Sequence, residues 1–171
     1  MANNQPSSSL FVVPSDTINI PQPGIITTGS VIASSATQLT DINPAQNFDP
    51  IVTNANGYTI NGAVVYQSYS GAFPSLITSV TGIISNTGPC IAKVSSAVVG
   101  GLYNMYSPNQ DGKTSFTLFV GSGGAASTLR VLTAAGDDVT LTEIPNGTFI
   151  PLQVVRVFDT GTTCSEILAL H

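Results

Sequence analysis

The sequence has very little charge. Asp, Glu, Lys and Arg make up 8% of its 171 residues, against about 25% in ordinary soluble domains. Between Ile51 and Gln110 the one charged residue is Lys93. A surface built from Ser, Thr, Asn, Gln and backbone suits a protein that packs against other proteins, because few charges lose water when an interface closes. An extracellular domain with a Ser/Thr-rich surface is the alternative.

Basic residues and long apolar runs are also scarce. Four basic residues stand against nine acidic ones, for a net charge of −5, so nucleic acid is not an expected partner. No run of about 18 apolar residues is present, so no membrane span is expected. The opening stretch "MANNQPSSSLFVVP" lacks the basic start and apolar core of a secretory signal, and synthesis in a cytoplasm is expected.

Metal ligands and paired cysteines are few. Cys90 and Cys164 lie in β-type sequence without C-x-x-C spacing, so both are interpreted as buried thiols, with a disulfide left open. The single histidine, His171, argues against a zinc site and against a Ser-His-Asp triad. Asp137 and Asp138 are interpreted as turn residues rather than cation ligands. We therefore expect no metal, no cofactor and no enzymatic activity.

Helix-type periodicity is missing, whereas Val, Ile, Thr and Ser abound. Short apolar runs are separated by turn sequences such as Asn56-Gly57, Asn61-Gly62 and Asp111-Gly112. The chain is therefore predicted to be all-β, with almost no helix. The expected architecture is an antiparallel β-sandwich or barrel, jelly-roll-like, with an inserted small β-barrel-like module.

The C-terminal third predicts five successive strands. They are Ser115–Gly121, Thr128–Ala134, Asp138–Ile144, Phe149–Asp159 and Ser165–Leu170. Connections of about four to six residues are typical of hairpins. In the fourth of these strands the polar residues Gln153 and Arg156 are three positions apart, so a regular strand would place them on opposite faces. This change in the alternation indicates a β-bulge near Val154 and Val155. Arg156 itself is either a rim residue or half of a buried pair.

A glycine-rich stretch, "VGSGGAAS" at Val120–Ser127, falls on G-x-G-x-x-A through Gly121, Gly123 and Ala126. A phosphate-binding turn of this type needs a helix after it, because the helix N-terminus supplies the N–H donors. The residues that follow are β formers and end in another turn. The stretch is therefore interpreted as a flexible hairpin loop around Gly121, Gly123 and Gly124.

Two blocks of the sequence carry a denser pattern. The first is "FVVPSDTINIPQPG" at Phe11–Gly24. The second runs through Leu118–Gly124, Gly136–Thr140, Pro145–Val157 and the "TGTT" of Thr160–Thr163. Together they cover under half of the chain and resemble the spike-base family of tailed bacteriophages and gene transfer agents.

The chain departs from compact members of that family by about ninety residues between the two blocks. This segment reads as four or five strands, and is similar to modules inserted in marine phage virion proteins. The resemblance thus implies a spike-base-like β domain with an N-terminal arm at residues 1–24 plus 110–171. The inserted β module occupies residues 25–109.

The resemblance implies a non-enzymatic virion structural protein on the outer surface of the capsid, made in the cytoplasm of a bacterial host. It would be a head decoration or cement protein, or the base of a head spike or fibre. The implied partners are the major capsid protein, further copies of the chain as a trimer or pentamer, and a head fibre where one is mounted.

The N-terminal arm supplies the candidate interface residues. Leu10, Phe11, Val12 and Val13 follow a polar stretch and are expected to order against the capsid or a neighbouring subunit. The alternative is a frayed terminus ahead of an ordinary first strand.

A carbohydrate-binding adhesin on a phage fibre or a cell surface is the competing function. Its candidate site is an outward aromatic patch of Tyr66, Tyr69, Phe73, Tyr103 and Tyr106, which could stack on sugar rings. Tryptophan is absent, and aromatic residues near strand ends also serve as core. An adhesin requires these rings in a solvent-facing groove, whereas a capsid protein would bury them.

Overall fold

The structure is a computed structural model that describes residues 6–41, 62–68, 74, 76–85, 91–98, 100–109 and 111–171. These residues form strands and turns without a helix, which confirms the all-β prediction. Accordingly, the described part of the chain offers no helix that is long and apolar enough to cross a bilayer.

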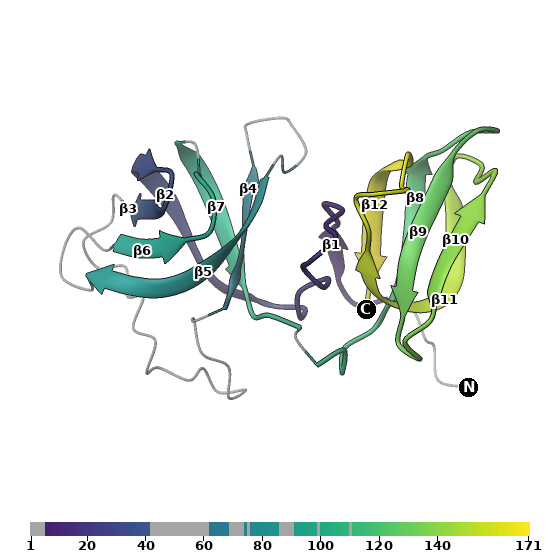
Figure 1. The fold of residues 1–171 in the computed structure, drawn as a ribbon, viewed down its shortest axis with the longest axis horizontal. Helices are drawn as coiled ribbons and strands as arrows, with labels where there is room; N and C mark the ends of the chain where they lie inside the picture. The colour runs from purple at the N-terminus through teal and green to yellow at the C-terminus, as the bar shows by residue number, and fades with distance from the viewer. Residues whose placement is uncertain are drawn as a thin grey trace. The chain divides into compact units, whose positions relative to one another are not determined.

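The chain divides into two compact units (Figure 1). Unit 1 combines Met1–Pro23 with Asn109–His171, and unit 2 is Gly24–Pro108. The bounds expected from the sequence were 1–24 with 110–171 and 25–109. Each unit is therefore described by itself.

Unit 1 is a six-stranded antiparallel sheet in the order β1-β12-β8-β11-β9-β10. Its strands are β1 (Ser9–Phe11), β8 (Phe116–Ser122), β9 (Thr128–Thr133), β10 (Asp138–Thr142), β11 (Thr148–Val157) and β12 (Ser165–Leu170). The five strands predicted for the C-terminal third are present within two residues at either end. Among their successive pairs only β9 and β10 form a hairpin, because β8 pairs with β11 and β12.

A bulge in β11 lies where the change of parity predicted it. The register shifts between Ile150 and Val154 against β8, and between Val154 and Arg156 against β9. Val154 is opposite both Phe116 and Thr133. The bulge thus stands where the pairing of β11 passes from mainly β8 to β9, and it re-aims the following side chains.

The core of unit 1 comes from one face of this sheet. Leu118, Val120, Ile150, Ile167 and Ala169 alternate with outward residues along their strands and are at most 5% exposed. Full burial of a Val, Leu or Ile side chain stabilises a fold by roughly 1.5–3 kcal/mol. Period-two alternation therefore decides which face turns inward.

Unit 2 is a closed antiparallel barrel in the order β2-β3-β6-β5-β4-β7. Its strands are β2 (Ile25–Ser35), β3 (Gln38–Asp41), β4 (Val64–Ser68), β5 (Leu76–Ser85), β6 (Ile91–Val94) and β7 (Gly101–Tyr106). The structure has six strands where the sequence predicted four or five. Closure leaves no open sheet edge, which a β protein with little charge otherwise needs to protect.

A buried polar pair lies inside the barrel. The hydroxyl of Tyr103 donates to Oδ2 of Asp41 at 2.6 Å, and the backbone N–H of Ser30 donates to the same oxygen at 3.2 Å. Both paired residues are at most 1% exposed. Position 29 must be glycine, because a Cβ there would overlap Oδ2 of Asp41 and the Tyr103 hydroxyl.

Candidate interaction surface

The outer face of the unit 1 sheet carries a line of large apolar side chains. Phe11 of β1 is opposite Leu168 of β12, Leu168 is opposite Phe119 of β8, and Phe119 is opposite Phe149 of β11. Residues in register on neighbouring strands lie on the same face of a sheet. We call these four residues the apolar row.

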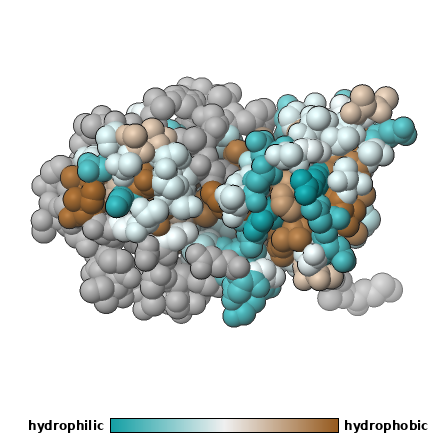
Figure 2. All heavy atoms as spheres, viewed as in Figure 1, coloured by the Kyte–Doolittle hydropathy of each residue, from teal (hydrophilic) through white to brown (hydrophobic). Residues whose placement is uncertain are grey.

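The apolar row is most exposed at Phe149, which is 61% accessible to solvent. Its ring contacts Phe119 edge to face, with ring centroids 5.0 Å apart and an interplanar angle of 60°. Phe11, Phe119 and Leu168 are half-buried. Figure 2 shows hydrophobic side chains reaching the surface between hydrophilic ones. An exposed aromatic ring supported by a second ring is typical of a contact surface.

The positions next to the apolar row are neutral on one side and include an acidic residue on the other. Ser9, Leu170 and Thr117 make the next line of register partners on one side. On the other side, Gly121 of β8 lies against Glu166, and a Cβ on this glycine would approach the Glu166 side chain to 2.9 Å. The acidic side chain therefore lies against the glycine.

A shallow groove adjoins one end of this face. Its lining residues are Pro6, Lys113, Thr114, Ser115, Thr117, Phe149, Gln153, Leu170 and His171. The lining is mostly polar, and Ser115 donates to Gln153 at 2.6 Å within it. Lys113 is paired with Asp111 at 2.6 Å. The apolar part of the groove thus comes mainly from Phe149 and Leu170.

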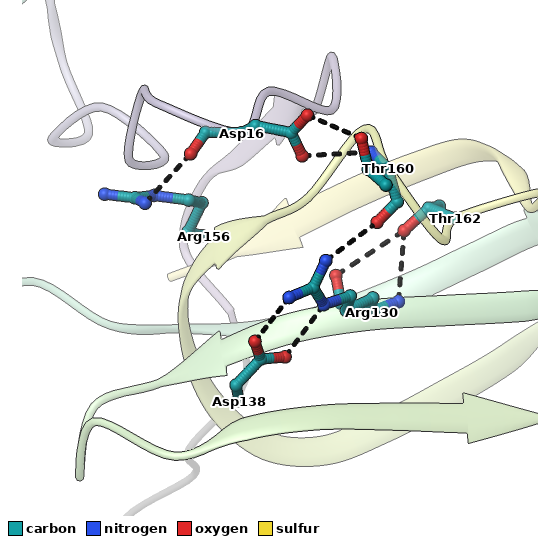
Figure 3. A network of polar contacts seen from close by, with 6 residues as sticks. All are labelled: Asp16, Arg130, Asp138, Arg156, Thr160 and Thr162. Atoms are coloured by element: carbon teal, nitrogen blue, oxygen red, sulfur yellow. Dashed lines mark hydrogen bonds and ion pairs between the residues drawn. The ribbon is translucent and has the colours of Figure 1, made fainter.

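The two blocks behind the family resemblance meet in unit 1 (Figure 3). Asp16 of "PSD" accepts the backbone N–H of Thr160 at 2.9 Å and its hydroxyl at 2.7 Å, and Thr160 opens "TGTT". These bonds from Thr160, the backbone one first, lower the pKa of the Asp16 carboxyl. They tie the segment after β1 to the loop between β11 and β12.

Arg130 of β9 extends the same network. Its guanidinium binds both carboxylate oxygens of Asp138, at 3.0 and 2.6 Å, and donates to the carbonyl of Thr160 at 3.4 Å. It also lies over the ring of Phe158, 4.5 Å from the centroid. The bonds from Arg130 lower the pKa of the Asp138 carboxyl. The backbone N–H of Arg130 donates to the hydroxyl of Thr162.

Arg156 matches the rim interpretation. It donates to Oδ1 of Asn19 at 2.8 Å and to the carbonyl of Asp16 at 3.1 Å. Both acceptors are neutral, and the side chain is half-buried. Arg156 therefore anchors the segment after β1 instead of forming a buried ion pair.

The glycine-rich loop leads into strand β9, as expected from its β-type continuation. The hairpin interpretation is wrong, because β8 and β9 do not pair with each other. Ser127 Oγ accepts from the N–H groups of Gly124 and Ile144 at 3.1 Å each. A Cβ at Gly123 would overlap the carbonyl oxygen of Ile144. The loop is thus hydrogen-bonded to the residues after β10.

The N-terminal candidates divide between the two faces of their own sheet. Leu10 and Val12 are buried at 8% and 3% exposure, Val13 is half-buried, and Phe11 belongs to the apolar row. The expectation of a segment that orders only against a partner is wrong for residues 9–13. β1 pairs with β12 through three residues, so the ordinary-first-strand alternative holds for it.

The expected outward aromatic patch is not present as such. Tyr66 and Tyr103 are 4% and 1% exposed, because the strands of the closed barrel bury them. Tyr106 is half-buried and meets Tyr66 edge to face, with ring centroids 5.4 Å apart. Burial raises the pKa of both Tyr66 and Tyr106. Tyr69 and Phe73 lie outside the described residues.

The structure also bears on the predictions made for the two cysteines and for the neighbouring carboxylates Asp137 and Asp138. Cys164 is a buried free thiol, as predicted, and Cys90 lies outside the described residues. Asp138 belongs to the Arg130 pair, and Asp137 is exposed in the turn before β10. Within the described ranges, no three His, Cys, Asp or Glu side chains cluster as metal ligands do.

Sequence reasoning missed Phe119, Phe149 and Leu168 as surface residues. Each stands beside a buried neighbour of similar character, Leu118, Ile150 or Ala169. The available signal was that these strands carry apolar residues on both of their faces. Read together with a strand pairing, that signal places three large apolar residues on the face away from the core.

Comparisons of the chain with protein-family models, with curated proteins and with solved structures gave no match.

Proposed function

We propose that this chain is a non-enzymatic structural protein of a virion, seated on the outer surface of the capsid. It decorates or cements the shell there, or forms the base of a head spike or fibre. It acts through interfaces with the major capsid protein and with other copies of itself.

The observation that carries this proposal is the outer face of unit 1. A 61% exposed phenylalanine lies in a row of apolar side chains, on a chain with 8% charged residues. Such a face loses little hydration energy when protein covers it. The resemblance of the "PSD" and "TGTT" blocks to spike-base proteins adds the virion context.

A carbohydrate-binding adhesin is less well supported. Its stacking platform requires accessible rings, and burial withdraws Tyr66 and Tyr103 from the surface. Phe149 offers an exposed ring, but the second exposed ring that lines the mostly polar groove beside it is the imidazole of His171, and neither a tyrosine nor a tryptophan lines this groove.

An antibody raised against the recombinant chain tests the proposal on intact particles of the virus that encodes it. Gold-labelled antibody is expected on the heads in electron micrographs, and particles from a gene-deletion virus serve as the control. Label confined to fibre tips, together with binding of the chain to a glycan array, would favour the adhesin. Absence of the chain from purified particles would overturn the virion assignment.

A further inference from the structure

Strand β10 ends the unit 1 sheet, because among the described residues it pairs with β9 alone. Its five residues, Asp138–Thr142, run beside β9 without a register shift and include neither proline nor lysine. Natural sheets usually protect an open edge with such residues, with a bulge or with a very short strand. The other edge strand, β1, has three residues. The edge of β10 is therefore the longer of the two and lacks these protections.

The backbone of β10 presents alternate residues to this open edge. The N–H of Thr133 donates to the carbonyl of Asp137, and the N–H of Glu143 donates to the carbonyl of Ser127, each at 2.9 Å. Alternate residues of an antiparallel strand bond the same neighbour, so the odd-numbered positions face β9. The N–H and C=O groups that face the open edge, and that bond no other backbone group in the described part of the chain, belong to Asp138, Thr140 and Thr142.

The side chains of β10 on the core face are incompletely covered. Val139 and Leu141 lie opposite Val131 and Leu129 of β9. The two β9 residues are 0% exposed, whereas Val139 and Leu141 are half-buried. A further strand with apolar residues at the positions opposite Val139 and Leu141 would cover them, because directly opposed side chains on one face are in contact.

The charge around this edge is acidic. Asp138 is paired with Arg130 at 2.6 Å. Asp137 before the strand and Glu143 after it are exposed, and neither forms an ion pair within the described ranges. The whole chain has a net charge of −5. The local and the overall charge therefore both attract a basic segment.

A second copy of the chain does not fit this edge. Antiparallel pairing of two β10 strands that uses every outward-facing residue is centred on Thr140. That pairing brings Asp137 of each copy to Glu143 of the other, and like charges placed opposite each other are destabilising. The occupant is therefore a segment of a different protein.

We propose that the open edge of β10 binds an extended segment of another protein as an added antiparallel strand. Apolar residues of this segment alternate and cover Val139 and Leu141, and basic residues flank them near Asp137 and Glu143. A strand is the occupant because an extended backbone matches the spacing of the outward N–H and C=O groups. This inference goes beyond the proposed function and does not depend on it.

The test titrates the isotope-labelled full chain with the capped peptide Lys-Thr-Val-Thr-Val-Thr-Lys. Antiparallel on β10, its valines face Leu141 and Val139, and its lysines face Glu143 and Asp137. The amide signals of the outward-facing residues are expected to shift in NMR spectra, and their hydrogen exchange is expected to slow. An absence of binding, or shifts confined to other strands, would overturn the inference.

Modified peptides separate strand addition from non-specific adhesion. N-methylation of the central threonine removes the N–H that points to Thr140 and is expected to weaken binding about tenfold. N-methylation of a valine, whose N–H points away from β10, should leave the affinity unchanged. Equal affinities of these two peptides would contradict strand addition. Replacing both lysines with glutamate should also weaken binding, and an unchanged affinity would refute a basic partner.

Variants of the chain test the same edge from the other side. Thr140→Pro removes the central outward N–H and breaks no bond to β9, and proline is tolerated at such edge positions. It is expected to lose about tenfold in affinity, whereas Thr140→Ala keeps the backbone donor and should bind as the wild type does. Circular dichroism checks both folds, and the modified peptides carry the test if the proline variant unfolds. Unchanged binding by a folded Thr140→Pro variant would overturn the inference.

The chain alone supplies a last check. If its solution mass shows an oligomer that Thr140→Pro dissociates, a second copy occupies the edge and the inference is wrong. A monomer whose Thr140 amide exchanges rapidly until the peptide is added supports it. Antibody labelling of particles tests the proposed function separately, so either proposal can fail alone.

Discussion

Single residues in unit 1 are constrained by backbone that approaches them closely. Gly123 is the clearest case, because the carbonyl oxygen of Ile144 occupies the space that a side chain would need. Its own N–H donates to Oδ1 of Asn146 at 2.8 Å, and the next N–H, of Gly124, donates to the Ile144 carbonyl at 2.7 Å. The glycine thus serves close packing of two chain segments, with no nucleotide involved.

Gly123→Ala is expected to lower the free energy of unfolding of unit 1 by about 1–3 kcal/mol, the usual cost of overpacking. The reason is that backbone atoms must move to admit the methyl group. The midpoint of urea unfolding measures the effect. Gly82→Ala is the control, because a Cβ there meets nothing within 4 Å. Equal midpoints for the two variants would show that the loop accommodates the added methyl group without a loss in the free energy of unfolding.

Segments far apart in the sequence are joined by the contacts of Asp16. The carboxylate lies 144 positions from its partner Thr160, and both of its oxygens accept hydrogen bonds. Ser15 adds a backbone bond to Val157 at 2.9 Å, and Ile20 adds one to Val155 at 2.8 Å. The segment after β1 is therefore held along β11 and its following loop. Truncating the chain before Pro14 should also destabilise unit 1 rather than release a free arm, because it removes the pairing of β1 with β12 and the buried side chains of Leu10 and Val12.

The contacts of Asp16 give stability a defined dependence on pH. Since the folded state lowers the pKa of this carboxyl below its ordinary value of 3.8, its contribution is present above that value and is lost as the pH falls through the folded pKa. Wild-type unfolding midpoints should therefore drop in this acidic range. Asp16→Asn should be less stable than wild type at pH 6 and differ less from it at the acid end.

The matched control for this pH series is Asp137→Asn, which changes an exposed turn carboxylate whose side chain makes no hydrogen bond or ion pair in the described structure. A constant difference between Asp16→Asn and wild type across the whole series would mean that the Thr160 bonds do not depend on the carboxylate charge.

The elements were easier to predict than their pairing. Alternation and turn residues placed β8 to β12 within two residues, and the parity change at Gln153 and Arg156 located the bulge. The pairing of β8 with β11 and β12 joins residues far apart in the sequence, such as Leu118 with Ala169, and no local pattern contains it. Likewise, the Thr- and Ser-rich β2 was not recognised as a strand of the barrel, because its polar side chains hide the alternation.

The site was predicted less well than the fold, for a physical reason. Leu10 and Phe11 are adjacent and equally apolar, yet the register sends one into the core and the other to the outer face. Exposure of Phe149 similarly follows from which face of β11 turns inward. The tyrosines were assigned outward because closure of the barrel around Tyr103 is a property of six strands together.

At the scale of the whole molecule, the sequence of one unit is inserted into the sequence of the other. The chain enters the barrel beside the point where it leaves, since Ile25 is paired with Tyr106. In unit 1, Asn19 donates to the carbonyl of Asn109 at 2.6 Å, so the segments on either side of the insertion are already held together. An insertion whose ends lie close costs its host little loop entropy.

Replacing residues 24–108 with a short Gly/Ser linker is therefore expected to leave unit 1 folded. The shortened chain should show a β-type circular dichroism spectrum and one cooperative thermal transition. The Asn19→Ala change in the same background should lower the transition temperature, because it removes the hydrogen bond from the Asn19 side chain to the carbonyl of Asn109, which joins the two ends of the linker. A non-cooperative melt of the shortened chain would show that unit 1 needs the barrel in order to fold.

The pairing of β1 with β12 has a mechanical consequence. The strands are antiparallel, and Ser9 lies opposite Leu170, so a pull that separates the two ends of unit 1 acts across the strands instead of along them. Such a load peels the three paired residues apart one after another, and it meets far less resistance than a shearing load spread over a whole ladder. An attachment that bears force through this protein would hold best if one end of the chain and the apolar row were clamped in the same interface.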